Sequence, residues 1–189
     1  EPWRCIWLEP SLVRDMDGAL LFSVRGCADS RLSSDAPKDV NHRVRVWRLN
    51  DGGGDWQLII DAPNARGQAP VTLNRALDGS PYIFATKLGH EREWLCIWPL
   101  NEDRTGLQEP ITVRNALAEF GPPPVGPVWF MDHPNGQTVQ LADGAWHHLL
   151  GYRIMDRGEH AGAPPAPQTG LYVEEAFSAG PPIPVWRFD

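Results

Sequence analysis

The sequence predicts an all-β chain that forms three four-stranded antiparallel blades of a β-propeller. A unit of two strands joined by an Asp-Gly or Asn-Gly turn, an aromatic-centred third strand and a short fourth strand occurs three times. A period of roughly 40–60 residues with four strands per unit is typical of propeller blades. The 19 prolines and 18 glycines favour short strands joined by turns, and no segment shows the apolar period of a long helix.

The first blade is predicted over residues 9–63. Its first two strands flank Asp17-Gly18, and an Asp-Gly pair between apolar strands favours a type I′ hairpin turn with positive φ angles. The third strand, RVRVWRLN, centres on Trp47, and DWQLIID supplies the fourth. Residues 1–8 are predicted to form a strand that opens the chain or completes a neighbouring blade.

The second and third blades are predicted over residues 68–115 and 125–177. Their expected turns and third-strand aromatic residues are Asp78-Gly79 with Trp98, and Asn135-Gly136 with Tyr152. Trp47, Trp98 and Tyr152 are therefore expected to be buried at equivalent positions. The connectors between blades, 62–70 and 115–127, are rich in glycine and proline, as blade crossings should be. A Pro-rich tail, 178–189, ends in VWRF, which could form a last strand.

Three blades cannot close a ring, because known propellers have about four to eight. Each blade packs only on its neighbours, so the terminal blades of a partial propeller expose apolar faces. We therefore expect a partial propeller that is completed by further blades of a longer protein or by a second chain. The start at Glu1 rather than Met, without a signal peptide, indicates a processed, engineered or excised terminus.

Composition excludes several classes of protein. A net charge of −7 and a pI near 5.3 argue against a nucleic-acid partner, and the absence of an 18-residue apolar run argues against a membrane span. The three cysteines form no CxxC or metal-binding spacing, and Cys96, in an apolar strand, is expected to be a buried free thiol. No phosphate loop or dinucleotide motif is present, so we expect neither a metal nor a cofactor.

The segment LNDGGGDW, residues 49–56, resembles the Asp-box of sialidase-like propellers, Ser-x-Asp-x-Gly-x-Thr-Trp. Asp51, Gly53 and Trp56 match the motif, whereas Leu49 and Asp55 depart from it. The resemblance is to the BNR/Asp-box repeat proteins, which include sialidases, other glycosidases, polysaccharide lyases and non-catalytic members. It implies a structural hairpin, in which Asp51 accepts hydrogen bonds from turn amides, on the face opposite the active site. A secreted or periplasmic location is expected for such a protein.

The topology of a propeller places the loops between second and third strands, together with the blade crossings, at one face, the mouth of the channel. The expected mouth loops are 25–43, 62–70, 87–93, 115–127 and 142–146. His90-Glu91-Arg92 brings an imidazole, a carboxylate and a guanidinium onto one of them, which suits proton transfer and the clamping of an acidic sugar. A solvated charge cluster is the alternative interpretation.

The candidate catalytic residues are His90, Glu91 and His42, and the candidate glycan-binding residues are Arg66, Arg92 and Arg31. Asp132-His133 precedes the expected Asn135-Gly136 turn and is interpreted as structural. His147 and His148, adjacent on a strand, must point to opposite faces, so they do not form a metal site together. A sialidase needs three convergent arginines, and the sequence alone does not place three together.

Two functions follow as the main hypotheses. The first is a carbohydrate-active enzyme, a glycoside hydrolase or polysaccharide lyase with its site at the propeller mouth. The alternative is a non-catalytic propeller that binds a glycan or a protein, and a purely structural assembly module stays a third. A convergent acid–base pair beside an arginine would favour the enzyme, whereas exposed tryptophans without titratable neighbours would favour the binding module.

Overall fold

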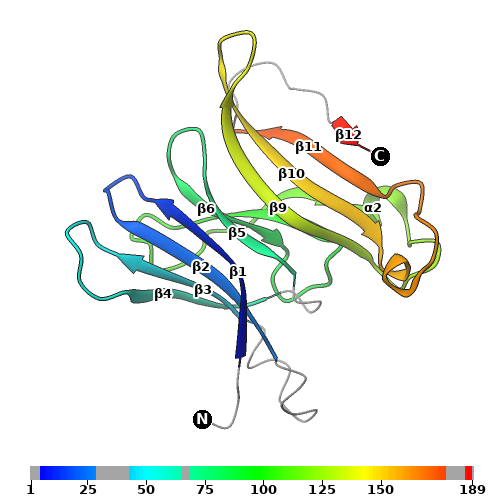
Figure 1. The fold of residues 1–189 in the computed structure, drawn as a ribbon, viewed down its shortest axis with the longest axis horizontal. Helices are drawn as coiled ribbons and strands as arrows, with labels where there is room; N and C mark the ends of the chain where they lie inside the picture. Colours follow the sequence, from blue (N-terminus) through cyan, green and yellow to red (C-terminus); the bar gives the residue numbers. More distant parts are fainter. Residues whose placement is uncertain (1–4, 29–42, 65–68, 178–185, 189) are drawn as a thin grey trace.

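The computed structural model describes residues 5–28, 43–64, 69–177 and 186–188, which form three four-stranded antiparallel sheets (Figure 1). The first sheet contains β1 (Cys5–Arg14), β2 (Leu20–Ala28), β3 (Arg43–Leu49) and β4 (Gln57–Pro63). The second contains β5 (Val71–Arg75), β6 (Pro81–Thr86), β7 (Trp94–Pro99) and β8 (Ile111–Asn115). The third contains β9 (Trp129–Gln140), β10 (Trp146–Asp156), β11 (Gly170–Ala176) and β12 (Trp186–Phe188). The predicted all-β fold of three four-stranded blades is confirmed.

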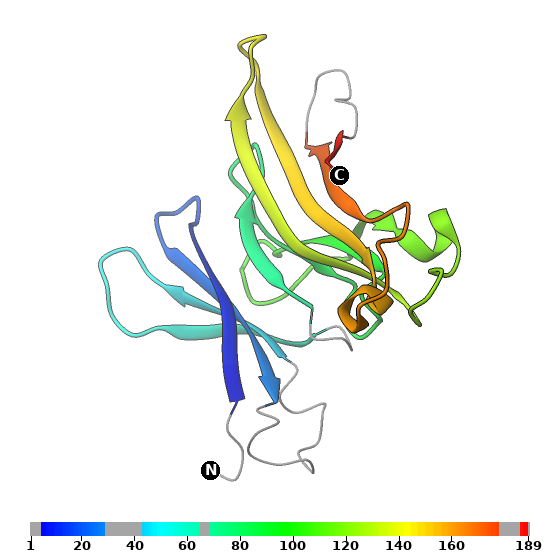
Figure 2. The same cartoon turned by 45° about the vertical axis from the view of Figure 1, so that its right-hand side comes forward.

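The first strand of each sheet lies at the centre of the molecule. β1 contacts β5, and β5 contacts β9, so that the sheets fan outward from these three inner strands (Figures 1 and 2). In the part of the chain that the structure describes, the helical elements are short: α2 (Ala116–Phe120) and the 3-10 helix η1 (Arg157–Ala161). Within the described residues, no helix has the length and apolar content required to cross a membrane.

The turn after each inner strand has the same geometry in all three sheets. Its glycine has φ of 90° at Gly18, 90° at Gly79 and 82° at Gly144, and the aspartate before that glycine accepts the amide hydrogen of the residue after it. The aspartates themselves do not have positive φ. The turns are therefore three-residue loops with a glycine in the left-handed region, and the predicted type I′ geometry is wrong.

The third of these turns is Asp143-Gly144, and the prediction of a turn at Asn135-Gly136 is wrong. Both residues lie within β9, where Asn135 pairs with Gly151 and Gly136 with Leu150. Gly136 is required by packing, because a Cβ atom there would lie 2.0 Å from the Tyr82 hydroxyl of the second sheet.

This register changes the roles of the strands in the third sheet. β10 is its second strand, so Tyr152 lies on a second strand and pairs with Tyr172 on the third. Trp47 and Trp98 occupy equivalent third-strand positions, but both are only half-buried. The expected equivalence of Tyr152 with these tryptophans is wrong: the residue at their position in the third sheet is Ala176, which pairs with His148. β12 pairs with β11, so the third sheet extends beyond residue 177 into the predicted tail.

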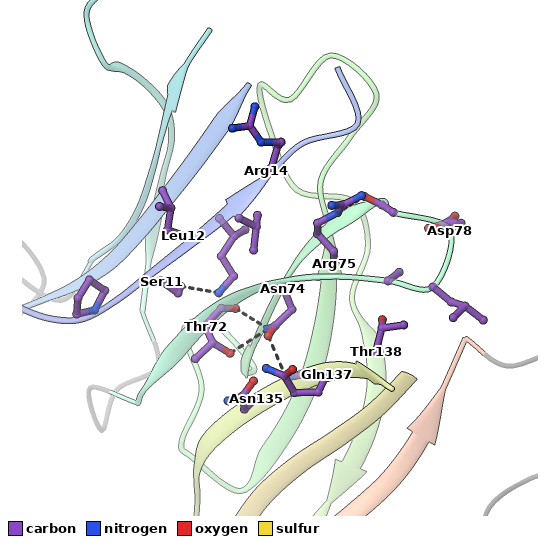
Figure 3. A pocket seen from close by; sticks show the side chains of 17 residues that line it. Ser11, Leu12, Arg14, Thr72, Asn74, Arg75, Asp78, Asn135, Gln137 and Thr138 are labelled. Atoms are coloured by element: carbon purple, nitrogen blue, oxygen red, sulfur yellow. Dashed lines mark hydrogen bonds between the residues drawn. The ribbon is translucent and has the colours of Figure 1, made fainter. Parts of the chain in front are cut away.

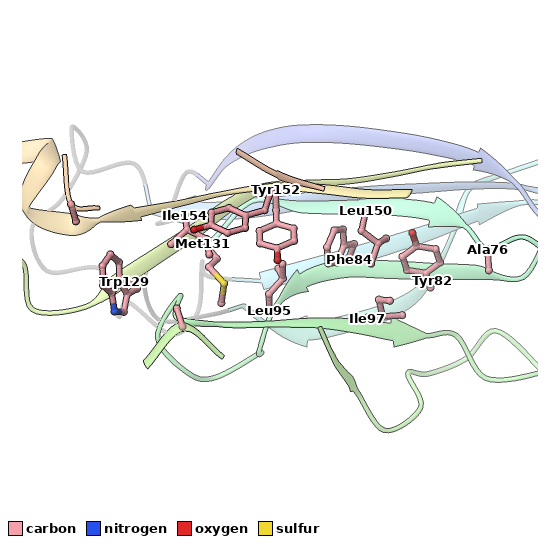
Figure 4. Close-up of a cluster of buried hydrophobic side chains, with 13 residues drawn as sticks. Ala76, Tyr82, Phe84, Leu95, Ile97, Trp129, Met131, Leu150, Tyr152 and Ile154 are labelled. Atoms are coloured by element: carbon pink, nitrogen blue, oxygen red, sulfur yellow. The ribbon is translucent and has the colours of Figure 1, made fainter. Parts of the chain in front are cut away.

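Two apolar cores separate the sheets. The core between the second and third sheets is drawn in Figure 4 and includes Tyr82, Phe84, Leu95, Trp129, Leu150 and Tyr152. The core between the first and second sheets includes Leu21, Val44, Val46, Val71, Leu73 and Ile83. Cys96 is a buried free thiol, as expected, and burial raises its pKa to about 11.

One side of the first sheet is open and apolar. Ile83, on the second strand of the second sheet, faces the first sheet. The equivalent residue on the second strand of the first sheet is Phe22, because Phe22 pairs with Trp47 as Ile83 pairs with Trp98. Phe22, Trp47 and Trp56 line a hollow of about 340 Å³. In the second and third sheets, this face packs on the preceding sheet. In the first sheet no described residue covers it, as expected for the terminal blade of a partial propeller.

Candidate functional site

The three inner strands line a polar groove of about 730 Å³ (Figure 3). Its walls are residues 10–14 of β1, residues 72–79 of β5 and the following turn, and residues 135–138 of β9. Asn135 and Gln137 are exposed within it. Because all three sheets supply a wall, the groove is the part of the propeller channel that these three blades enclose.

Side chains join the inner strands across the groove. The Ser11 hydroxyl accepts the Leu73 amide hydrogen at 2.7 Å. On the other side of β5, the Asn74 side chain accepts the Gly136 amide hydrogen at 2.9 Å (Figure 3), and Thr72 donates to the Pro134 carbonyl at 2.7 Å. These bonds take the place of a main-chain ladder between the sheets, so the walls of the groove are held at fixed separations.

Charged residues gather beyond the Pro10 and Asn135 end of the groove. We call them the mouth cluster, and its members are Glu9, Arg25, Arg92, Asp132, His133 and Arg153. Glu9 accepts two hydrogen bonds from Arg25, from Nε and, at 2.9 Å, from Nη2. Arg25 is buried, so this fork-to-fork pair fixes the direction of the Glu9 carboxylate.

Asp132 is the buried carboxylate of the cluster. Arg153 donates to its two oxygens at 2.9 and 2.8 Å, and Arg92 Nη1 lies 4.0 Å from Asp132 Oδ2. His133 follows it in the chain, with a side chain that is 65% exposed and an Nε2 atom 3.9 Å from Asp132 Oδ1. An exposed imidazole thus has a buried, arginine-bound carboxylate behind it.

Arg92 connects the parts of the cluster. Its guanidinium lies over the Phe130 ring at 4.5 Å. Burial, and the positive charge of Arg25 nearby, lower the pKa of Arg92 to about 10, while the carboxylates of Asp132 and Glu9 oppose that shift. Arg25, Arg92 and Arg153 therefore converge from the first, second and third sheets, which the sequence alone did not reveal.

The chemistry of the mouth cluster suits an oxygen-rich ligand. Guanidinium groups bind hydroxyl and carboxylate oxygens, and carboxylates and imidazoles accept or donate protons. Among the residues that the structure describes, no group of three or more metal-ligating side chains comes together. The sequence signal that could have identified Glu9 and His133 is the Xaa-Pro pair that each forms in an inner strand.

The candidate residues from the sequence fall in different places. Arg92 belongs to the mouth cluster. His90 and Glu91 line a separate pocket of about 350 Å³, in which the His90 ring meets the edge of Trp94 at 5.8 Å between centroids. His42, Arg31 and Arg66 lie outside the described residues. The structure therefore does not bring His90 and Glu91 together with Arg92.

Two interpretations of the third blade need correction. Loop 142–146 is the turn between β9 and β10, equivalent to the turns at Gly18 and Gly79, and so lies at the end opposite the mouth. Asp132-His133 lies within β9 in the mouth cluster rather than beside a turn. The opposed directions of His147 and His148 are confirmed: His147 bonds to Asp143 and Glu175 of its own sheet, whereas His148 bonds to Tyr82 of the second sheet.

The segment that resembles an Asp-box lacks the expected bonds. Asp51 is 72% exposed and lies 3.9 Å from Arg14 Nη1, and in the described part of the chain it forms no hydrogen bond with the turn amides. Gly53 has φ of 91° and donates its amide hydrogen to the Asn50 carbonyl. Trp56 is 44% exposed, with its ring edge-on to Phe22. The expected structural role of Asp51 is therefore not found.

Comparisons with known proteins give the fold. No protein-family model matches the chain, and no curated protein matches it. A solved structure of α-L-arabinanase from Penicillium chrysogenum, in complex with arabinobiose, superposes with a TM-score of 0.54 at 12% identity and covers 96% of this chain and 49% of that one. A structure of α-L-arabinofuranosidase from Fusarium graminearum, with an iminosugar inhibitor, gives 0.55 at 14% identity, with 96% and 48% covered.

A complex of the same GH93 α-L-arabinofuranosidase with arabinobiose gives a TM-score of 0.54 at 15% identity. These similar structures are β-propeller glycoside hydrolases, and this chain spans about half their length. The chain thus has the fold of part of such a propeller. No BNR/Asp-box or sialidase-like family is shown.

Proposed function

We propose that the chain is part of a carbohydrate-active propeller, a glycoside hydrolase or polysaccharide lyase, whose glycan binds at the mouth cluster. One observation carries the proposal: Arg25, Arg92 and Arg153 converge from three sheets on the carboxylates of Glu9 and Asp132. Arginine forks recognise sugar oxygens, and paired carboxylates are the usual catalytic groups of glycoside hydrolases. Arabinan-derived sugars, the ligands of two similar structures, are the first substrates to test.

The proposed enzyme is a closed ring in which further blades, from a longer chain or a second chain, cover the open face at Phe22 and Trp47. The groove of about 730 Å³ is then enclosed on its remaining sides and receives the glycan chain. Secretion or export to the periplasm suits a protein that acts on polysaccharides.

The test is a panel of arabinan, arabino-oligosaccharides and neutral and uronate-containing polysaccharides, scored for both binding and turnover. Arg92→Ala is expected to lower kcat/KM for the substrate found at least tenfold, or about 1.4 kcal/mol. Arg92→Lys keeps the charge but loses the planar fork, so it should recover little. Arg187→Ala, at an exposed residue of β12, is the matched control.

The outcomes separate the candidate functions. Turnover that depends on Arg92, at an unchanged unfolding midpoint, supports the enzyme. Binding without turnover supports a glycan-binding module instead, the alternative function that the same arginines would serve. A panel without binding or turnover refutes both.

A further inference from the structure

Two inner strands contain a strained residue at the same kind of position. Four non-glycine residues in the described ranges have positive φ, namely Glu9, Arg104, His133 and Phe177. Glu9, with φ of 52°, precedes Pro10 in β1, and His133, with φ of 50°, precedes Pro134 in β9. A residue before proline strongly prefers an extended backbone, so a positive φ at these two places is unfavourable.

Both strained residues belong to β-bulges. In β1 the pairing moves from Leu8–Arg25 to Ser11–Ser23, so Glu9 and Pro10 together oppose Val24. In β9 it moves from Asp132–Arg153 to Asn135–Gly151, so His133 and Pro134 together oppose Tyr152. A bulge of this kind bends the strand and redirects a side chain, and bulges are frequent beside active sites.

The packing of blades does not require the bulge of β1, because the second sheet has none at the same position. Ser11 of β1 and Thr72 of β5 are equivalent, because they lie the same number of residues before the turn glycines Gly18 and Gly79. The single residue Val71, which pairs with Ala85, then stands where β1 has Glu9 and Pro10. β5 packs against both neighbouring inner strands with an unbroken ladder. The strain in β1 therefore serves something other than blade packing. The bulge of β9 lies two residues farther from the shared turn, beyond the end of the β5 ladder, and has the same positive φ before a proline.

The bulge residues lie where the groove meets the mouth cluster. Pro10 lines the groove directly after Glu9, and Asn135 lines it two residues after His133. Arg25 holds the Glu9 carboxylate, and the buried Asp132 stands behind the exposed His133 ring. A carboxylate and an imidazole are thus displayed from two different blades at one end of the channel.

We infer that the two bulges exist to present Glu9 and His133 to the glycan as a proton-transferring pair, an assignment that rests on the proposed hydrolase function. A water oxygen forms the new bond to the anomeric carbon, and its proton passes to the Glu9 carboxylate. The glycosidic C–O bond breaks, and the leaving oxygen takes a proton from the His133 imidazolium. One water is consumed, the products are two free hydroxyl-bearing sugars, and both side chains then exchange protons with solvent.

Glycine at position 133 separates this role from a structural one. Because glycine adopts φ near 50° without strain and the His133 ring is largely exposed, His133→Gly should raise the unfolding midpoint by about 2–4 °C. The same variant should lose at least 100-fold in kcat. A residue that only supports the fold would instead lower the midpoint when replaced.

Glu9→Gln tests the carboxylate. The amide can still accept a hydrogen bond from Arg25 but cannot take up a proton, so kcat should fall at least 100-fold while KM stays within about twofold. Glu102→Gln, an exposed carboxylate at the opposite end of the molecule, is the matched control. Glycan binding by both variants should persist.

Each outcome decides the assignment. If the wild-type protein turns over a glycan and Glu9→Gln and His133→Gly do so equally well, the pair is refuted while the proposed function stands. A lower midpoint for His133→Gly would show that the bulge is structural and would also overturn the assignment. If the wild-type protein acts on no glycan in the panel, the proposed function fails and the pair fails with it.

Discussion

Replacing Gly136 by alanine tests how the third sheet packs on the second. A Cβ atom at Gly136 would lie 2.0 Å from the Tyr82 hydroxyl and 2.9 Å from His148 Nε2. Neither group can move away, because Tyr82 and His148 are both buried and share a hydrogen bond of 2.6 Å. The Nδ1 atom of His148 is held in turn by Thr138 at 2.8 Å.

The expected destabilisation follows from these contacts. Overpacking a filled core costs about 1–3 kcal/mol, and loss of the bond between Tyr82 and His148 adds about 1–3 kcal/mol. Gly136→Ala should therefore lower the free energy of unfolding by roughly 2–6 kcal/mol. Tyr82→Phe alone should cost about 1–3 kcal/mol, because it leaves His148 Nε2 without its partner.

A double-mutant cycle gives the decisive measurement, by urea unfolding followed through tryptophan fluorescence. Gly136→Ala and Tyr82→Phe remove the same hydrogen bond, and phenylalanine also removes the clashing oxygen. Their combined cost should be smaller than the sum by at least about 1 kcal/mol. Gly144→Ala is the control, since its φ of 82° makes alanine unfavourable by about 1 kcal/mol but no described atom lies within 4 Å of a Cβ there. Additive effects of Gly136→Ala and Tyr82→Phe would refute the close packing of Gly136 against Tyr82.

Two further predictions concern stability. Trp129→Ala should cost about 3–5 kcal/mol in urea unfolding, because the indole is fully buried and donates to a backbone carbonyl at 2.7 Å; a loss below about 1 kcal/mol would contradict its place in the core. The bond to Glu175 raises the pKa of His147 above 6.5, so its stabilisation is present below pH 6.5 and is lost as pH rises through the folded pKa. Burial lowers the pKa of His148, so stability should decline as pH falls below 6.5. In unfolding midpoints measured from about pH 5 to 8, His147→Gln should flatten the alkaline decline and His148→Gln the acid one, and unchanged slopes would contradict both assignments.

Local chemistry decided which parts of the fold were predictable. Asp17-Gly18 and Asp78-Gly79 were found because an aspartate that bonds to the turn and a glycine with positive φ act within five residues. The same chemistry is available at Asn135-Gly136 and at Asp143-Gly144. The choice between them is made by the Tyr82 hydroxyl, which belongs to another blade and which no local pattern contains.

The site was less predictable for the same reason. Arg92 was identified because it lies on a loop that propeller topology places at the mouth. Glu9 is paired with Arg25 within the first sheet and Asp132 with Arg153 within the third, and only the packing of the sheets brings these pairs to Arg92 of the second. The two bulges are marked by positive φ angles at Glu9 and His133, and backbone conformation of this kind is visible only in the folded structure.

The mouth cluster does not depend on further blades for its geometry. Each carboxylate is held by an arginine of its own sheet, Glu9 by Arg25 and Asp132 by Arg153. The inner strands beneath them are joined by the bonds of Ser11, Thr72 and Asn74 across the sheet boundaries. Closure of the proposed ring would therefore act on the open sides of the groove and on the apolar face at Trp47. A substitution at that face should weaken ring closure, and with it glycan turnover, whereas a substitution in the cluster should weaken turnover while closure persists.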